Sequence, residues 1–291
     1  EKAGIGDMRK IGILPNAKKD SGLAATKTLI AALLQENCRP MLNENLNLPQ
    51  SLRQYAIRED LLYREAEFLI VLGGDGTMLS SAKRAAKYNT PLMGVNMGHL
   101  GFLTAAGPDT MVESLQSVLR GEYQTEKRMM LRAEIFSSKE GKRTVTALNE
   151  VSISRGSMVD VEVKVNGDYI DDFFGEGILV ATPTGSTAYN LAAGGPILKS
   201  DSNVLAITPI CPHMLHARSI VIGGNDRVEL IVKRFSRQKI FAVVDGQNIC
   251  TLEEGDSISI SKAKFFANII KTGNTGFYDV LRNKLFGKGD R

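Results

Sequence analysis

Three glycines, an aspartate and a threonine form the run Gly73 to Thr77, directly after the apolar residues Phe68 to Leu72. An apolar run of this length is typical of a strand buried on both faces of a parallel sheet, and the residues after Thr77 are typical of a helix. Gly74 and Gly76 can adopt backbone angles closed to other residues and, lacking a side chain, let the main chain approach a phosphate closely. Free amides at the start of the helix would face that phosphate. We therefore expect a phosphate-binding turn in which Asp75 supplies a carboxylate.

The run matches neither the Gly-x-x-x-x-Gly-Lys-Ser/Thr nor the Gly-x-Gly-x-x-Gly signature of other nucleotide sites. An ordinary Asp-Gly turn is the alternative interpretation. The end of a parallel strand, however, is where α/β sheets bind their ligands, so the position favours the functional interpretation.

A second polar stretch, Thr182 to Tyr189, carries four hydroxyl side chains besides the Tyr189 ring and follows a predicted strand. Hydroxyls and backbone amides bond to sugar or phosphate oxygens, and an aromatic ring offers a face to a base. This pattern predicts capture of a polar ligand. A solvated Ser/Thr loop is the alternative.

Two short motifs are weaker. Asn149 and Glu150 place an amide beside a carboxylate, a pair that can bond to a ribose diol or a base edge, although a dipeptide alone favours a surface position. The sequence from Asp245 to Gln247 predicts a hairpin turn, with ligand contact by Gln247 as the less favoured option.

The histidines do not predict a metal site. His213 and His216 have the spacing of a helical pair, but no third ligand is suggested nearby. We interpret them, and His99, as loop or capping residues. The spacing of the Ser, His and Asp residues does not indicate a Ser/His/Asp catalytic site.

The first 127 residues alternate strand and helix patterns, which predicts a parallel sheet with crossover helices. The first strand is expected at Ile11 to Leu14. Asp20 or Ser21 is expected to cap the next helix, whose apolar face holds Leu23, Ile30, Leu33 and Leu34. Asp109 is expected to cap a later helix that stops at Gly121.

From Met129 onward the pattern alternates as in strands, and Asn166-Gly167 after Val159 to Val165 predicts a hairpin. We place an α/β domain at residues 1–127 and a β-rich domain at residues 128–275, with Phe265 to Ile270 as the last strand. A C-terminal helix at about residues 276–287 should pack back on the first domain.

Composition excludes several classes of protein. Of the 291 residues, 43% are hydrophobic and 23% charged, which excludes a disordered chain. No apolar stretch approaches the roughly 20 residues of a membrane helix, and the start has no export signal. Three separated cysteines argue against a disulfide framework, so we expect a cytoplasmic protein. The net charge of +4 is dispersed and says little about nucleic acid, and we expect no nucleic-acid partner.

Taken together, the motifs resemble the NAD kinase family over Ile11 to Leu285. The motifs that carry the resemblance are Gly73 to Thr77, Asn96 to Leu103, Asn149-Glu150, Thr182 to Tyr189 with Gly194-Gly195-Pro196, and Pro212-His213 with Arg218. The first motif also occurs in diacylglycerol and sphingoid-base kinases. The glycine-rich loop that follows Asn-Glu makes the resemblance specific.

The resemblance implies a Rossmann-like α/β domain, a β-rich NAD-binding domain and a site between them. It implies transfer of the terminal phosphoryl group of ATP, in some members of polyphosphate, to the 2′-hydroxyl of the adenosine ribose of NAD, which gives NADP. A divalent cation, normally Mg²⁺ and bound mainly through nucleotide phosphates, and a homotetramer or homodimer are also implied.

Carried over by position, the resemblance makes Asp75 the catalytic aspartate. It implies substrate or nucleotide contacts at Gly74, Gly76, Phe102, Asn149, Glu150, Glu176, Thr184, Thr187, Ala188, Tyr189, Asn190, Leu191, Ala192 and Gln247.

The chain departs from the family pattern at three positions. Phe174 stands where many members have Arg or Lys, Glu176 where they have Asp, and Ala192 where Ser is common. These changes bear on affinity or on the choice between NAD and NADH. Two alternatives follow: a lipid kinase, whose acceptor would call for an apolar slot, and a non-catalytic dinucleotide-binding sensor. Asp75 argues for catalysis.

Overall fold

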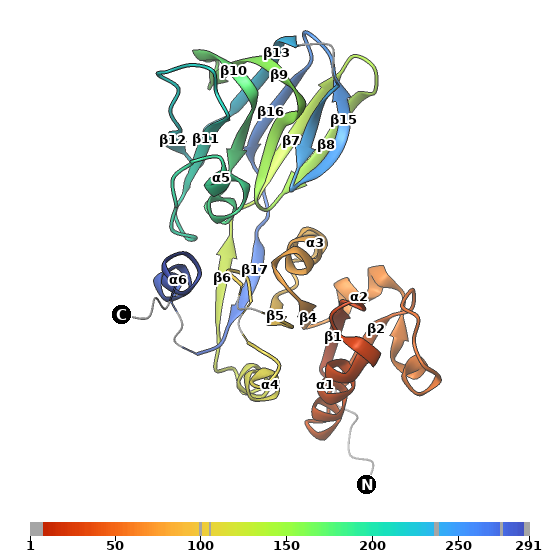
Figure 1. Ribbon diagram of the computed structural model, residues 1–291. Coiled ribbons are helices and arrows are strands. Elements are labelled where there is room, and N and C mark those ends of the chain that lie inside the picture. Colours follow the sequence, from red (N-terminus) through yellow and green to blue (C-terminus); the bar gives the residue numbers. More distant parts are fainter. Residues whose placement is uncertain (1–7, 99–100, 105, 236–238, 274–275, 288–291) are drawn as a thin grey trace. The chain divides into compact units, whose positions relative to one another are not determined.

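The computed structural model describes residues 8–98, 101–104, 106–235, 239–273 and 276–287 (Figure 1). The chain forms two compact units, one from residues 1–127 with 267–291 and the other from residues 128–266. The second unit thus ends at Phe266 instead of residue 275, because the next strand belongs to the sheet of the first unit.

The first unit contains a seven-stranded sheet in the order β3-β2-β1-β4-β5-β17-β6. The neighbouring strands from β3 to β17 pair in parallel, as the alternating pattern predicts. Every residue of β4 is buried, in keeping with its uninterrupted apolar sequence. The strands are β1 (Lys10–Pro15), β2 (Arg39–Asn43), β3 (Ala56–Ile57), β4 (Phe68–Gly73), β5 (Leu92–Asn96), β6 (Gln124–Arg128) and β17 (Ala267–Lys271).

Helices cover both faces of this sheet (Figure 1). On one face, α1 (Ala24–Gln35) and α4 (Met111–Leu119) pack on Ile11, Ile70 and Met93. The other face carries α2 (Glu59–Glu65) and α3 (Asp75–Ala85). The unit also contains 3₁₀ turns at Ser21–Leu23, Gln50–Tyr55 and Ala86–Tyr88, and at its C-terminal end α6 (Phe277–Leu281) followed by a π-helical turn at Arg282–Phe286.

The structure confirms one detail of the predicted helices and corrects two. The buried Asp20 carboxylate accepts hydrogen bonds from the Ala25 and Thr26 backbone N–H groups and from the Thr26 hydroxyl, so it holds the start of α1 as expected. Thr110, and not Asp109, occupies the N-cap position of α4. Leu34 does not share the buried face of α1, since 46% of it is exposed.

The second unit is a ten-stranded antiparallel sheet in the order β12-β11-β10-β9-β13-β16-β7-β8, with β14 paired to β15 and β9. The long strand β9 organises it, because its start pairs with β14 and its end with β13. Alternating residues of these strands form one apolar core. The strands are β7 (Leu131–Ser137), β8 (Gly141–Ala147), β9 (Glu150–Val165), β10 (Asp168–Ala181), β11 (Val204–Ile210), β12 (Ile220–Gly223), β13 (Val228–Phe235), β14 (Ile240–Val244), β15 (Gln247–Leu252) and β16 (Ser257–Lys262).

The predicted hairpin lies between β9 and β10. Asn166 and Gly167 connect the two strands with φ values of 55° and 95°. Positive φ at both turn residues is what a two-residue hairpin requires and what Asn-Gly supplies. The two strands then pair almost without interruption to Glu150 and Ala181, where the polar loops of this unit begin.

All three cysteines are free thiols. Burial raises the pKa of Cys38 and of Cys250, which keeps both protonated. Among the described residues, no helix is both long enough and apolar enough to cross a membrane.

We predict that Asp20→Ala lowers the free energy of unfolding by about 1–2 kcal/mol, because the first turn of α1 loses its acceptor. Urea unfolding followed by circular dichroism measures the change. The matched control is Asp109→Ala, which removes a carboxylate from the exposed residue before Thr110 and should change stability by less than about 0.5 kcal/mol. Equal losses for both variants would contradict the assignment of the caps.

Candidate functional site

The carboxyl ends of β1 and β4 lie side by side at the point where the strand order of the first unit reverses. From β1 the chain continues to β2 on one side, and β4 pairs with β1 on the other side. Such a switch point is where open α/β sheets bind ligands. A pocket of about 400 Å³ lies there, lined by Asn16, Lys19, Gly74, Asp75, Gly76, Thr77 and Ser80.

The glycines of this turn act through the space they leave. Gly74 is extended, with φ −130° and ψ −169°, and neither Gly74 nor Gly76 has a positive φ. The expectation of special backbone angles is therefore wrong. A Cβ on Gly76 would meet nothing within 4 Å, whereas one on Gly74 would lie 2.8 Å from Lys19 Nζ. The main chain therefore carries no side chains at these two positions, where it borders the pocket.

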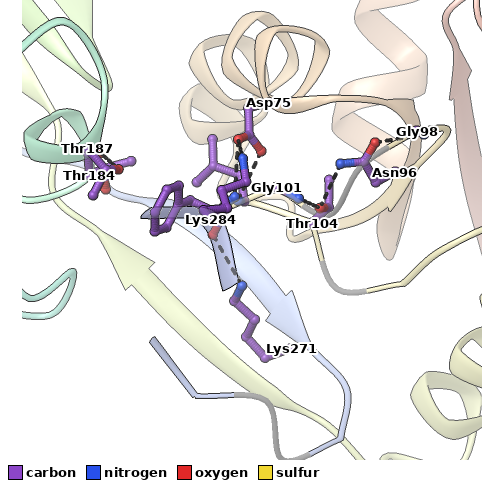
Figure 2. A network of polar contacts seen from close by, with 11 residues as sticks. Asp75, Asn96, Gly98, Gly101, Thr104, Thr184, Thr187, Lys271 and Lys284 are labelled. Atoms are coloured by element: carbon purple, nitrogen blue, oxygen red, sulfur yellow. Dashed lines mark hydrogen bonds and ion pairs between the residues drawn. The ribbon is translucent and has the colours of Figure 1, made fainter. Parts of the chain in front are cut away.

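Asp75 is the first residue of α3, and its carboxylate is fixed by a distant segment (Figure 2). The backbone N–H of Phe102 donates to Oδ2 at 3.1 Å, and that of Leu103 donates to Oδ1 at 3.2 Å. Lys284 Nζ lies 3.4 Å from Oδ2. A Cβ on Gly101 would lie 2.0 Å from Oδ1, so only glycine leaves room for this carboxylate.

The segment that holds Asp75 is itself anchored (Figure 2). Thr104 Oγ1 accepts the Gly101 N–H at 3.0 Å, and Asn96 Oδ1 accepts the Gly98 N–H at 3.0 Å. Lys271 Nζ donates to the Phe102 carbonyl at 3.5 Å. His99 and Leu100, named in the sequence motif, lie outside the described residues. The Phe102 ring, half-buried, lies 6.3 Å from the ring of Phe277.

The second unit has its own polar cluster, in which Asp245 holds the Asn149-Glu150 segment. The Asp245 carboxylate accepts the N–H groups of Leu148, Asn149 and Glu150 at 3.1, 2.8 and 3.2 Å. Its own N–H donates to the Glu150 carbonyl at 3.0 Å. Asp245 adopts φ 47° in the turn between β14 and β15, so the predicted turn is present and has a second role that the sequence did not indicate.

The hydroxyl-rich loop packs against the same segment. Thr182 donates its N–H to the Asn149 carbonyl at 2.9 Å and its hydroxyl to the Leu148 carbonyl at 2.6 Å. A Cβ on Gly185 would lie 2.1 Å from the Asn149 carbonyl oxygen. The Asn149-Glu150 segment is therefore held from one side by Asp245 and from the other by this loop.

Most polar side chains of the loop are used within the protein. The buried Asn190 amide donates to the carbonyls of Ser186 and Pro196 and accepts the hydroxyl of Thr208. The Ser186 hydroxyl, fully buried, donates to the Pro183 carbonyl at 2.7 Å and accepts the Leu198 N–H at 3.0 Å. The expectation that the hydroxyls capture a ligand is wrong for Thr182 and Ser186, and Asn190 acts through the shape it gives the loop.

The remaining predicted contact residues differ in accessibility. Thr184 is buried, and its carbonyl accepts the hydroxyl of Thr187 at 3.3 Å. Tyr189 is 41% exposed at the start of the short helix α5 (Tyr189–Ala192). Ala188 and Leu191 are half-buried, whereas Ala192, Glu176 and Gln247 are exposed.

Phe174 and the two histidines of the sequence motifs, His213 and His216, form local contacts. Phe174 is exposed, and its ring meets that of His213 edge-on at 5.9 Å. His216 Nε2 lies 3.5 Å from Asp171 Oδ2. In the described part of the chain, no group of three or more His, Cys, Asp or Glu side chains could hold a metal ion. Asp75 is the one carboxylate among the described residues that line the pocket.

Sequence reasoning missed Lys284, Lys271, Lys19 and Asp245. The turn at Asp245 was predictable, but no local signal points from Asp245 to backbone N–H groups 95 to 97 positions away in the sequence. The lysines had no such signal either, because each acts on a segment that only the fold brings to it.

Two protein families match the chain. The ATP-NAD kinase N-terminal domain matches residues 12–123. The ATP-NAD kinase C-terminal domain matches residues 148–272. Together they span more than half of the sequence.

Full-length relatives agree. An NAD kinase of Thermoanaerobacter sp. (strain X514) is 40% identical over 281 residues, which cover 96% of this chain and 99% of that protein. An NAD kinase of Symbiobacterium thermophilum is 41% identical over 235 residues, which cover 80% and 83%.

Among solved structures, yeast NADH kinase complexed with NADH has a TM-score of 0.84 at 21% identity, covering 99% of this chain and 90% of that one. An NAD kinase from Archaeoglobus fulgidus in complex with ATP has a TM-score of 0.74 at 24% identity, covering 96% and 100%. At these identities the likeness shows the fold, a parallel α/β unit joined to an antiparallel β unit.

We predict that Asp245→Ala lowers the free energy of unfolding by about 2–3 kcal/mol, because it leaves backbone N–H groups without their acceptor. Asp245→Asn keeps one oxygen for Asn149 and Glu150 and should lose about half as much. Urea unfolding of each variant measures both effects. A loss below about 0.5 kcal/mol for Asp245→Ala would show that the carboxylate does not hold the segment.

Proposed function

The chain belongs to the NAD kinase family and phosphorylates NAD with ATP, and we propose that Asp75 is its catalytic residue. We propose further that the acceptor is the 2′-hydroxyl of the adenosine ribose, so that the product is NADP. The single observation that carries the role of Asp75 is its geometry: a fixed carboxylate at the edge of a pocket bordered by bare main chain. With both family domains matched, the lipid-kinase and sensor alternatives are not favoured.

Asp75 orients the acceptor hydroxyl and takes its proton. Within the described residues, Oδ1 accepts one hydrogen bond, from Leu103, and a carboxylate oxygen can accept two. The second hydrogen-bond position of Oδ1 suits the O–H group of a substrate. A sugar hydroxyl is far less acidic than a carboxylic acid, so proton transfer before attack is unfavourable. Transfer late in the reaction is consistent with the loose transition state of phosphoryl transfer.

The pocket at the switch point suits the phosphates of ATP. The start of α3 offers N–H groups at the positive end of an 11-residue helix, and Lys19 contributes a positive charge. Asn16 and Thr77, which hydrogen-bond to each other at 3.0 Å, line the same pocket. A Cβ at Gly76 would extend into open space, so glycine leaves the main chain accessible to phosphate oxygens.

The donor set fits Mg²⁺ brought in with the nucleotide. Asp75 supplies hard oxygen atoms, and Mg²⁺ takes most of its ligands from phosphates and water in such sites. When bound, the ion would neutralise charge on the phosphates. A cation that needs a complete cage of protein ligands does not fit these residues.

The second unit is proposed to bind NAD. Asn149 and Glu150 are held in place by backbone contacts with Asp245, and we assign to these two residues the recognition of ribose or base. Tyr189 presents a ring beside the rigid loop, and Ala188, Leu191 and Ala192 give that loop a small, apolar rim. Cytoplasmic location and a homotetramer or homodimer stay predictions.

We predict that Asp75→Asn lowers kcat for NADP formation by about 10²–10⁴-fold, because the amide cannot accept a proton. Purified protein is incubated with Mg²⁺-ATP and NAD, and NADP is detected with an NADP-specific dehydrogenase. The control, Asp109→Asn, makes the same change at an exposed carboxylate of the same unit that does not line the pocket, and it should retain activity within about threefold. Near-normal turnover of folded Asp75→Asn would reject the role of Asp75, and no NADP from the unaltered chain would reject the 2′-hydroxyl as acceptor.

We predict that Tyr189→Ala raises the KM for NAD by about tenfold, the value of one lost aromatic contact, and leaves the KM for ATP within about twofold. Initial rates at varied concentrations of each substrate measure both constants. The control is Tyr169→Ala, which removes another exposed ring of the same unit and should change neither constant. A larger increase in the KM for ATP than in the KM for NAD would contradict the assignment of this loop to NAD binding.

A further inference from the structure

The C-terminal segment brings one positive charge to Asp75. Lys284 lies in the π-helical turn after α6, and its Nζ is 3.4 Å from Asp75 Oδ2. Both residues belong to the first unit although 209 positions separate them in the sequence. The ammonium also lies 5.0 Å from the centre of the Phe102 ring, so an aromatic face supports it.

Positioning of Asp75 does not need this lysine. The N–H groups of Phe102 and Leu103 already fix both carboxylate oxygens, and Gly101 provides the space. The side chain of Lys284 is 33% exposed and that of Asp75 is 37% exposed, so the pair is accessible to a ligand. A flexible four-carbon stem lets an ammonium move between neighbouring anions.

We infer that Lys284 is a second catalytic residue, which binds the phosphoryl group as it arrives at the acceptor and then holds it in the product. This inference rests on the proposed role of Asp75. An acceptor hydroxyl bonded to Asp75 Oδ1 lies next to the Lys284 ammonium, because the two occupy the same carboxylate. The phosphoryl group that joins this hydroxyl therefore forms its new bond beside Lys284.

The step balances without another reagent. The bond between the γ-phosphorus of ATP and its β–γ bridging oxygen breaks, a bond forms from the acceptor oxygen to that phosphorus, and ADP leaves. Asp75 takes the hydroxyl proton. Lys284 takes no part in the proton transfer and exchanges its contact with Asp75 for contacts with the oxygens of the transferred group, which carry the developing charge.

The test compares Lys284→Met with Lys284→Arg and with Arg282→Met. Met keeps the length of the stem and removes the charge, so kcat should fall about 100-fold. Arg retains the charge and should restore kcat to within about tenfold of the unaltered enzyme. Arg282→Met removes one positive charge from the same segment, where Arg282 pairs with Asp279 at 3.0 Å, and should retain full activity.

Binding separates a phosphate contact from a merely structural effect. Isothermal titration without ATP should show that Lys284→Met weakens NADP binding about tenfold or more and leaves NAD binding within about twofold, because only NADP carries the additional phosphate. Equal weakening of both ligands, or no weakening of NADP, would overturn the inference.

A double-mutant cycle with Asp75→Asn excludes an indirect effect through the Asp75 charge. If Lys284 binds the phosphate directly, Lys284→Met still weakens NADP binding about tenfold in the Asp75→Asn background. If Lys284 only neutralises Asp75, the loss disappears there, and the inference fails. Failure of the proposed function is recognised separately, because the unaltered chain would then form no NADP from NAD and ATP.

Discussion

The carboxylate of Asp75, held by the backbone of another segment, is the constraint on which the first unit depends. Phe102 and Leu103 donate hydrogen bonds from their N–H groups to this carboxylate. Gly101 has no side chain and therefore leaves the space that the carboxylate occupies. An ionised acceptor makes these hydrogen bonds stronger than neutral ones. The turn after β4 and the segment after β5 are thereby joined at the carboxyl edge of the sheet, and neither can shift without moving the other.

The second unit uses the same device for a different purpose. The Asp245 carboxylate accepts three consecutive N–H groups, those of Leu148, Asn149 and Glu150, and thereby fixes this segment. Asp245 itself lies in a turn. A carboxylate can accept several N–H groups at once, which makes it an efficient clamp for the connection between β8 and β9. In the first unit the clamped carboxylate is itself the reactive group, whereas in the second it sets the position of its neighbours.

Sequence reasoning succeeded where the signal was local. The apolar run of β4 with its glycine-rich turn and the Asn166-Gly167 hairpin each depend on residues adjacent in the chain. It failed where the partner is remote: β17 was assigned to the second domain but pairs with β5, and nothing near Lys284 indicates Asp75. The hydroxyl of Thr182 was misread for the same reason, because its acceptor, the Leu148 carbonyl, lies 34 positions away. The hydroxyl of Ser186 has a local acceptor, the Pro183 carbonyl, but composition does not reveal that this hydroxyl is buried.

Buried polar groups explain why so few side chains remain for ligands in the loop after β10. Asn190 uses its carbonyl and both N–H bonds inside the protein, and a buried amide left unsatisfied would cost more than one bonded to water. These bonds fix the loop before any ligand arrives, so binding need not pay for ordering it. Rigid internal bonding of the hydroxyl-rich residues and exposure of Tyr189 are therefore two parts of one arrangement, in which the buried residues set the shape and the accessible ring makes the contact.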